Sequence, residues 1–212
     1  MPALRKHRAD VYALIAYIIL ALVLTYPLIL NFATRVAGDG SDDPALAWNL
    51  WWVPFSIINL GKSPVYTDYM FYPIGLNLAF YTLTYLNAFL SIPIQYAFNL
   101  VVATNVNLWL SFALGGFGTY LLVKYQLQKS EVRIQNPEIY SVAAFAAGAL
   151  YAFSSNKFLY ASLGQYNIAS SHWIPFYVLF LFKLTDAGSA PRAPRVLLRY
   201  GFLLGLFLLF QA

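Results

Sequence analysis

The chain has 212 residues, of which 60% are hydrophobic and only 10% are charged. A soluble domain carries roughly 25% charged residues, so this composition indicates an integral membrane protein. The formal net charge of +5 then reports orientation in the bilayer rather than nucleic-acid binding. The chain has no Cys and two His residues, which excludes disulfides, cysteine nucleophiles, thiolate metal sites and histidine-rich metal sites.

The N-terminal segment combines a basic start with a long apolar run. Arg5, Lys6 and Arg8 precede residues 11–30, which carry almost no polar side chain. At about 1.5 Å per residue, this run spans the hydrocarbon core of a bilayer. A cleaved signal peptide has a shorter core and a small-residue cleavage site. We therefore expect a retained signal-anchor helix with a cytoplasmic N-terminus.

An acidic cluster follows this run. Three of the eight acidic residues, Asp39, Asp42 and Asp43, fall within five positions. Carboxylates beside an apolar span cost free energy unless they lie in water, and a cluster of them there indicates a functional role. One would bind a hard divalent cation, Mg or Mn, while another deprotonates an acceptor hydroxyl. We predict catalytic roles for Asp39 and Asp42 and metal ligation by all three. The alternative is a turn and helix cap, which Asp43 before Pro44 suits.

A short helix is predicted over residues 44–60. Four aromatic residues recur at the spacing of one helical face: Trp48, Trp51, Trp52 and Phe55. Aromatic side chains of this kind prefer the membrane–water interface. We therefore expect this helix to lie along the membrane surface, with Pro54 bending or ending it.

The positive-inside rule sets the number of crossings. Ten of the thirteen Lys and Arg residues lie in the N-terminus, 124–133 and 183–199. If all three segments are inside, the chain returns once between residues 31 and 124. Segment 80–102, which contains Asn87, Pro93, Gln95 and Asn99, is then interfacial or re-entrant; two crossings is the alternative. The predicted spans are 11–30, 106–123, 139–153, 168–184 and 196 onward.

The predicted fold is an all-α integral membrane protein. It has about five or six transmembrane helices, and interfacial helices in a long first outer loop of about residues 31–80. We expect one polytopic membrane domain over residues 1–212. Because the chain ends within a hydrophobic run, we expect it to be the N-terminal part of a longer protein.

The second predicted outer loop holds the remaining candidate site residues. Lys157 would pair with a lipid phosphate, and Gln165 and His172 would contact the same substrate. The alternative for Lys157 is interfacial anchoring. The glycines of Leu114–Gly118 lie within a span, where a phosphate-binding loop would need a preceding strand. We expect these glycines to let helices approach closely.

The order of these elements resembles the GT-C superfamily of polytopic membrane glycosyltransferases. It is most similar to uncharacterised bacterial and archaeal members, on short motifs that run through the chain: Gly38-Asp39, Tyr72-Pro73-Ile74-Gly75, Gly164-Gln165 and His172-Trp173-Ile174-Pro175. The resemblance implies transfer of a sugar from a polyprenyl-phosphate carrier to an extracytoplasmic acceptor. It also implies a multi-pass protein of the plasma (inner) membrane, whose partners are membrane lipid and the lipid-linked sugar.

Within this resemblance, the acidic residue of the first outer loop acts as base or metal ligand. Asp39 is the best match and Asp42 the next. The acids here are spaced Asp-x-x-Asp-Asp, which departs from the common Asp-Glu or Asp-x-Asp pair. Two other functions stay open. One is a transporter or flippase-like protein, although the spans hold almost no ionisable residues. The other is a non-catalytic membrane scaffold or assembly protein.

Overall fold

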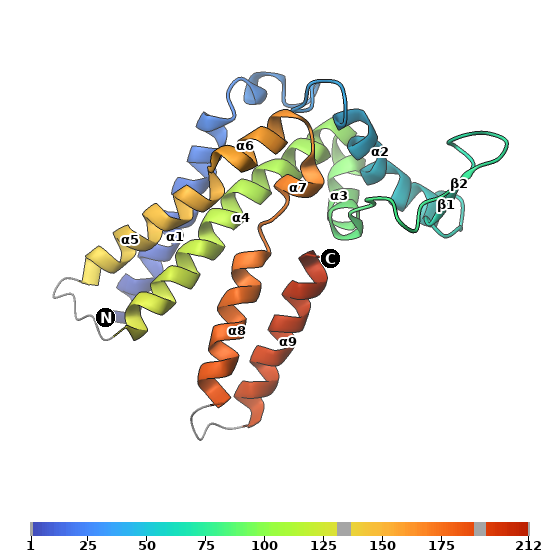
Figure 1. Cartoon of the computed structure of the whole chain (residues 1–212). Helices are drawn as coiled ribbons and strands as arrows, with labels where there is room; N and C mark the ends of the chain where they lie inside the picture. The colour runs from blue at the N-terminus through green and yellow to red at the C-terminus, as the bar shows by residue number, and fades with distance from the viewer. Residues whose placement is uncertain (1, 131–136, 189–193, 212) are drawn as a thin grey trace. The chain divides into compact units, whose positions relative to one another are not determined.

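The computed structural model describes residues 2–130, 137–188 and 194–211, and 73% of the chain is helical (Figure 1). Its contacts divide the chain into two compact units. Unit 1 comprises Met1–Thr25, Trp109–Phe158 and Ser170–Ala212, and unit 2 comprises Tyr26–Leu108 and Leu159–Ala169. Each unit is described by itself below.

The helices and strands follow one another in a simple order. They are α1 (Pro2–Leu24), the 3-10 helix η1 (Leu28–Asn31), α2 (Asp43–Pro54), the π-helix η2 (Phe55–Asn59), β1 (Tyr66–Thr67), β2 (Leu76–Asn77), α3 (Tyr85–Ala97), α4 (Leu100–Lys129), α5 (Pro137–Ala152), α6 (Ser155–Ser162), α7 (Tyr166–Ala169), α8 (Ile174–Gly188) and α9 (Pro194–Gln211).

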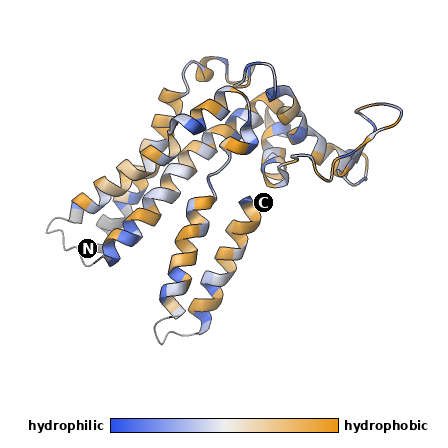
Figure 2. Cartoon of the chain, viewed as in Figure 1, coloured by the Kyte–Doolittle hydropathy of each residue, from blue (hydrophilic) through white to orange (hydrophobic). Residues whose placement is uncertain are grey.

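Three segments of the described chain are long and apolar enough to cross a membrane. They are Leu100–Lys129, Tyr166–Gly188 and Pro194–Gln211. Apolar residues dominate much of α8 and α9 when the chain is coloured by hydropathy (Figure 2). These three segments coincide with the spans predicted at 106–123, at 168–184 and from 196 onward. The total of five or six crossings stays a prediction.

One predicted span needs correction. The run 11–30 is not one helix, because α1 ends at Leu24 and η1 follows separately. Pro27 has no amide hydrogen to donate, and it disfavours a helical conformation at Tyr26. The helix predicted at 139–153 is present as α5, which has 16 residues, and its crossing of the membrane stays a prediction.

The break predicted within residues 80–102 is confirmed. α3 ends at Ala97, and α4 begins at Leu100, so no single helix covers the segment. The amide of Val102 donates a 2.8 Å hydrogen bond to Oδ1 of Asn99. Asn99 therefore caps the start of α4. Pro93, by contrast, lies inside α3 without ending it. The position of α3 relative to a bilayer stays a prediction.

Unit 1 is built on a close approach of α1 to α4 and α5. Tyr17 of α1 is fully buried, and its hydroxyl donates a 2.9 Å hydrogen bond to the carbonyl of Phe145. A Cβ added to Gly116 would lie 2.7 Å from the Tyr17 ring, and one added to Gly148 would collide with the same side chain. The prediction that glycines of the 114–118 segment permit close helix packing is confirmed.

A polar group ties α1 to α4 in the same unit. The hydroxyl of Tyr120 donates a 2.8 Å hydrogen bond to Oδ1 of Asp10. Nζ of Lys124 donates to the same carboxylate oxygen and, at 2.8 Å, to the Tyr120 hydroxyl. The buried amine of Lys124 is thus paired with the half-buried carboxylate of Asp10, which satisfies the main condition for tolerating a buried charge.

Helices α8 and α9 form a hairpin held by aromatic rings (Figure 1). Phe207 of α9 stacks on Phe176 and Phe180 of α8, with ring centroids 5.2 and 5.5 Å apart. Trp173 lies 5.1 Å from Phe210 by the same measure. None of the described residues of α9 is buried within the chain. The mean hydropathy of α9 is 1.3, which is high enough for a helix that crosses a membrane.

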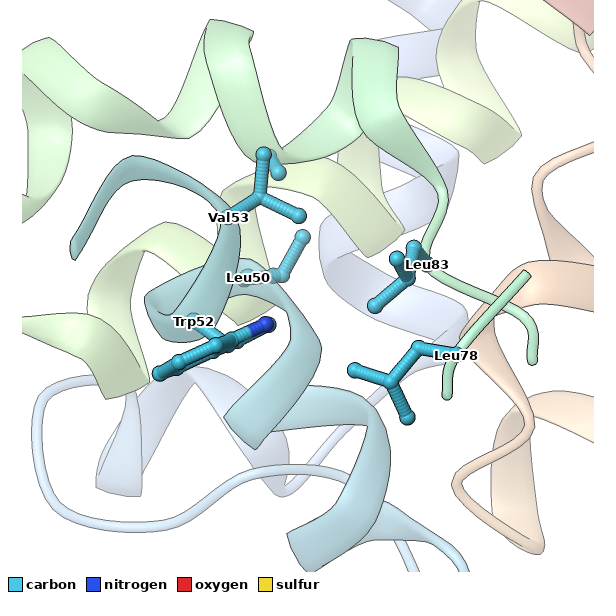
Figure 3. Packing of buried hydrophobic residues seen from close by; sticks show 6 residues of the cluster. Leu50, Trp52, Val53, Leu78 and Leu83 are labelled. Atoms are coloured by element: carbon cyan, nitrogen blue, oxygen red, sulfur yellow. The ribbon is translucent and has the colours of Figure 1, made fainter. Parts of the chain in front are cut away.

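Unit 2 has its own core around α2 and α3. Leu50, Trp52 and Val53 of α2 pack with Leu78 and Leu83 (Figure 3). The predicted helix over 44–60 is present as α2 followed by η2, and the change of helix type comes directly after Pro54. Pro54 thus ends the regular helix, as predicted.

The predicted aromatic face of α2 forms a ring cluster. Trp48 stacks on Trp52 at 5.3 Å, and Trp51 stacks on Phe55 at 4.4 Å. Trp52 is only 1% exposed, and its indole nitrogen donates a 2.9 Å hydrogen bond to the carbonyl of Pro64. The expectation that the whole face anchors in the interface is corrected for Trp52, which packs inside the unit.

A small hairpin follows in unit 2. Strands β1 and β2 are antiparallel, with Tyr66 opposite Asn77 and Thr67 opposite Leu76. The turn predicted at residues 72–75 lies between them. Its Gly75 has a φ of +73°, a conformation that glycine adopts without steric cost.

Candidate functional site

The acidic loop is folded back on itself at the start of α2. Asp43 is the first residue of α2, and its Oδ1 accepts a 2.7 Å hydrogen bond from the amide of Gly40. Asp39 accepts a 2.9 Å hydrogen bond from the amide of Ser41 through Oδ1. Asp42 holds the N-cap position, although its side chain makes no capping hydrogen bond. The predicted cap at Asp43 is therefore displaced by one residue.

The turn before α7 packs directly against this loop. Gly164 has a φ of +72°, and a Cβ there would lie 2.9 Å from the backbone nitrogen of Asp43. Glycine is required both by this backbone conformation and by this approach. The hydroxyl of Tyr166 donates to the carbonyl of Ala37 on the same side. Residues far apart in the sequence are thereby fixed beside the acidic cluster.

One direct contact joins the two predicted loops. Nε2 of Gln165 donates a 2.5 Å hydrogen bond to Oδ2 of Asp42. The two residues line a pocket of about 240 Å³, together with Ala45, Leu46, Asn49, Tyr81, Thr82, Asn167 and Ile168. All of these residues belong to unit 2. The predicted catalytic residue Asp42 and the predicted substrate-binding residue Gln165 are thus brought together.

Two asparagines of the pocket present buried oxygen atoms. Asn49 is fully buried, and its Nδ2 donates a 2.7 Å hydrogen bond to the carbonyl of Thr82. This bond fixes which way the amide points, so Oδ1 is the atom left over. The Oδ1 atoms of Asn49 and Asn167 are both buried and accept no hydrogen bond from the described part of the chain. Both oxygen atoms are enclosed by the chain, and the pocket lining also has groups that can donate hydrogen bonds, namely the amides of Gln165 and Asn167 and the hydroxyls of Tyr81 and Thr82.

The remaining acidic residues lie differently from Asp42. Asp39 is exposed and is not among the residues that line the pocket, while Asp43 is buried. Within residues 2–130, 137–188 and 194–211, no three His, Cys, Asp or Glu side chains gather closely enough to hold a metal ion. The described carboxylates do not by themselves fit a three-ligand metal centre, and we derive no step through a cation. Metal ligation by Asp39, Asp42 and Asp43 stays a prediction.

Lys157 and His172 form a separate group in unit 1. Lys157 is 5% exposed, and its Nζ donates a 2.8 Å hydrogen bond to the carbonyl of Ser111. Its Nζ also lies 5.3 Å from the centroid of the Phe112 ring, within cation–π range. Burial lowers the pKa of Lys157 to about 7. The snorkelling alternative for Lys157 is therefore wrong, because the amine points into protein.

His172 lies near this lysine. A Cβ added to Gly115 would be 3.1 Å from Nζ of Lys157 and 3.7 Å from Cβ of His172. His172 is 4% exposed, and its Nδ1 has no hydrogen-bond partner among the described residues. The two predicted substrate-binding residues of unit 1 are thus neighbours, and Gly115 leaves the space that they occupy.

A second pocket in unit 2 lies between α2–η2 and α3. Its volume is about 300 Å³. Its lining combines aromatic rings with two amides: Trp51, Pro54, Phe55, Asn59, Ile92, Gln95 and Tyr96. Nε2 of Gln95 donates hydrogen bonds to the carbonyl of Leu50 at 2.8 Å and to the Ser91 hydroxyl at 2.6 Å. The bond to Leu50 connects α3 to α2, whereas the bond to Ser91 lies within α3, so Gln95 has a structural role in the wall of this pocket.

Sequence reasoning missed Asn49 as a site residue. A signal for Asn49 was available, because Asp42, Leu46 and Asn49 recur at the spacing of one helical face. The interpretation relied instead on the aromatic residues, which lie on the opposite face of the same helix.

Comparisons with known proteins do not assign the chain to a family. No protein-family model matches the chain, and searches of curated proteins and of solved structures give no match. The fold defines a mostly helical chain with three candidate membrane-spanning segments among its described residues.

Proposed function

We propose that the chain is a membrane glycosyltransferase of the GT-C type. It would transfer a sugar from a polyprenyl-phosphate carrier to an acceptor on the extracytoplasmic face of the plasma membrane. The hydrogen bond from Gln165 to Asp42 within a 240 Å³ pocket is the observation that carries the proposal. It joins a carboxylate suited to base chemistry with the motif Gly164-Gln165 on which the resemblance partly rests.

Asp42 is the proposed general base. Gln165 occupies Oδ2, which leaves Oδ1 to accept a proton from the acceptor hydroxyl. The acceptor oxygen forms a bond to the anomeric carbon as the bond from that carbon to the phosphate oxygen breaks. The electron pair leaves with the polyprenyl phosphate, and the proton goes to Asp42. Gln165 is a positioning residue in this scheme.

The choice between Asp39 and Asp42 follows from their surroundings. Asp42 lines the pocket, whereas Asp39 is exposed and serves its own loop through Ser41. A base must come within hydrogen-bond reach of the proton that it takes. The proposal therefore assigns the base to Asp42, although the motif resemblance favours Asp39.

Lys157 and His172 are proposed as a phosphate-binding pair of unit 1. Burial favours the neutral amine of Lys157, and a phosphate bound beside it would favour the charged form and raise its pKa again.

The experiment is a transfer assay in membranes that contain the full chain. Polyprenyl-phosphate sugars, each with a radiolabelled sugar, are supplied as donors, and label that moves to membrane or soluble acceptors is counted. Transfer that requires the chain and is lost in Asp42→Asn supports the proposal. Label that stays on every donor favours the scaffold alternative.

A further inference from the structure

The loop between β1 and β2, residues 68–75, exposes three large apolar side chains. Phe71, Tyr72 and Ile74 are 72%, 84% and 83% exposed. The loop stands away from α2 and α3 of the same unit (Figure 1). Residues 69–77 contain no charged side chain, so keeping this surface in water costs free energy. Neighbouring apolar side chains exposed in this way indicate an interaction site.

The fold of the 68–75 loop keeps these side chains outside. The amides of Ile74 and Gly75 donate hydrogen bonds of 2.9 and 3.1 Å to the carbonyl of Phe71. The Tyr66 hydroxyl donates a 2.9 Å hydrogen bond to the carbonyl of Ile74. A Cβ added to Gly75 would lie 2.8 Å from the carbonyl oxygen of Thr67, so the turn is closely folded. The loop thus has a hydrogen-bonded frame of its own, and its apolar side chains project from that frame.

The backbone at Phe71 indicates that its exposed ring is used outside the fold. Phe71 has a φ of +55°, a left-handed conformation that glycine adopts without steric cost and that a bulky residue rarely takes. The stability of the loop alone would therefore favour glycine at this position. The position instead carries a phenyl ring that is mostly exposed. Strain of this kind at a non-glycine residue is typical of functional positions.

Unit 2 also contains the beginning of a candidate membrane-spanning segment. Residues 100–108 of α4 belong to this unit, and α4 is long and apolar enough to cross a membrane. A crossing takes about 20 residues, so the beginning of this 30-residue helix lies close to one surface of the bilayer. Lipid is therefore the apolar partner that α4 brings to unit 2.

The 68–75 loop is continuous with the aromatic face of α2. The Tyr69 ring packs edge-on against Phe55 and Trp51, with centroids 5.7 and 6.1 Å apart. Both α2-side rings are only partly buried, and their spacing in the sequence predicts a place at the membrane surface. Tyr and Trp rings are enriched at the membrane–water interface. The exposed rings of Phe71 and Tyr72 extend an aromatic surface of the same kind.

We infer that the 68–75 loop inserts Phe71, Tyr72 and Ile74 into the headgroup region of the bilayer that α4 crosses. The partner of this surface is lipid, and the loop fixes the depth of unit 2 at the membrane. The inference is independent of the reaction proposed above, because it uses no residue of the Asp42 pocket.

Site-directed spin labelling of the full chain in lipid nanodiscs tests the inference, since the chain has no native Cys. Tyr72→Cys and Ile74→Cys place the label in the 68–75 loop. Ser41→Cys, at an exposed residue of the acidic loop in the same unit, is the matched control. Collision of each label with oxygen, which concentrates in the bilayer, is compared with its collision with a water-soluble nickel chelate.

The ratio of oxygen to nickel collision is expected to be several-fold higher at positions 72 and 74 than at position 41. Nickel collision at 72 and 74 as frequent as at 41 would overturn the inference, because the loop would then lie in water. Infrequent collision with both reagents would also overturn it, because the loop would then be covered by protein, such as a second copy of the chain.

Phe71→Gly separates the ring from the fold. Glycine suits the φ of +55°, so the loop keeps its backbone conformation while it loses the phenyl ring. With the label at position 74, the oxygen-to-nickel ratio is expected to fall towards the value at position 41. Thr84→Gly is the matched control, because Thr84 also has a positive φ, of +42°, and lies outside the loop. Equal ratios in the two variants would show that the ring does not enter the bilayer and would overturn the inference.

Discussion

Nε2 of Gln165 donates a 2.5 Å hydrogen bond to Oδ2 of Asp42, across 123 positions of sequence. This contact fixes one carboxylate oxygen and leaves the other available within the pocket. It also holds the turn before α7 against the start of α2. A side chain that orients a base in this way should affect the rate of the reaction more than the binding of substrate.

Gln165→Leu removes this donor and keeps the approximate size of the side chain. We expect kcat for sugar transfer to fall about tenfold with little change in KM, since one hydrogen bond to a charged group is lost. The control is Gln126→Leu in α4, which should change neither constant. A rise in KM with an unchanged kcat in Gln165→Leu would contradict the positioning role.

Gly148→Ala tests the close packing in unit 1. The added Cβ would collide with the Tyr17 side chain and with the carbonyl of Gly116, and a backbone carbonyl cannot move aside. We expect a loss of about 1–3 kcal/mol, seen as a lower thermal unfolding midpoint in detergent. Gly205→Ala is the control, because nothing lies within 4 Å of a Cβ there. Equal midpoints for the two variants would show that α1, α4 and α5 do not pack as described.

Lys157 should make stability depend on pH. Its pKa of about 7 in the folded chain lies below the ordinary lysine pKa of 10.5, so the unfolded chain binds the proton more tightly. The penalty is complete below pH 7 and disappears as pH rises towards 10.5. Lys157→Met should therefore raise the unfolding midpoint most at or below neutral pH, by several degrees. The gain should shrink as the solution becomes alkaline.

The control for this prediction is Lys62→Met, which replaces an exposed lysine. It should change the midpoint little and equally at every pH. A stabilisation by Lys157→Met that stays constant across the range would mean that the amine is not buried in the folded chain.

Local sequence signals predicted where α2 ends, which of its aromatic residues share a face, and that the chain breaks before α4. Pro54 ends the regular helix α2, and the two stacked aromatic pairs of its face follow from helical spacing. The break before α4 was predicted from polar residues, and Asn99 provides it as a helix cap. The helix boundary at Leu24 was missed because the apolar run continues past Pro27, and hydropathy does not register the missing amide.

The site was less predictable because it depends on tertiary contacts. The acidic cluster and Gln165 were both marked as candidates, yet nothing in their spacing showed that Asp42 rather than Asp39 lies in a pocket. Lys157 was expected near water and is buried against Ser111. The space for its amine is provided by Gly115, more than forty residues earlier in the sequence, and no local pattern reports such a relationship.

The predicted topology is open to a direct test, because the chain has no native Cys. Single Cys substitutions at Gly40 and at Gln128 are exposed to an impermeant maleimide in intact cells. We expect labelling at position 40, in the first outer loop, and none at 128, near the basic end of α4. Part of the predicted inner segment, residues 131–136, lies outside the described residues. Labelling of the Cys at 128 from outside would contradict the orientation.

The central claim is that Asp42 is the base of a sugar transfer, and one paired substitution tests it most directly. Asp42→Asn and Asp39→Asn each remove a charge and keep the shape of the side chain. Both are compared with wild type in the polyprenyl-phosphate sugar assay, with expression and membrane insertion measured alongside. We predict that Asp42→Asn lowers transfer at least a hundredfold, as expected for a lost general base, with normal insertion. Asp39→Asn should keep most activity. Near-normal transfer by Asp42→Asn would contradict the account.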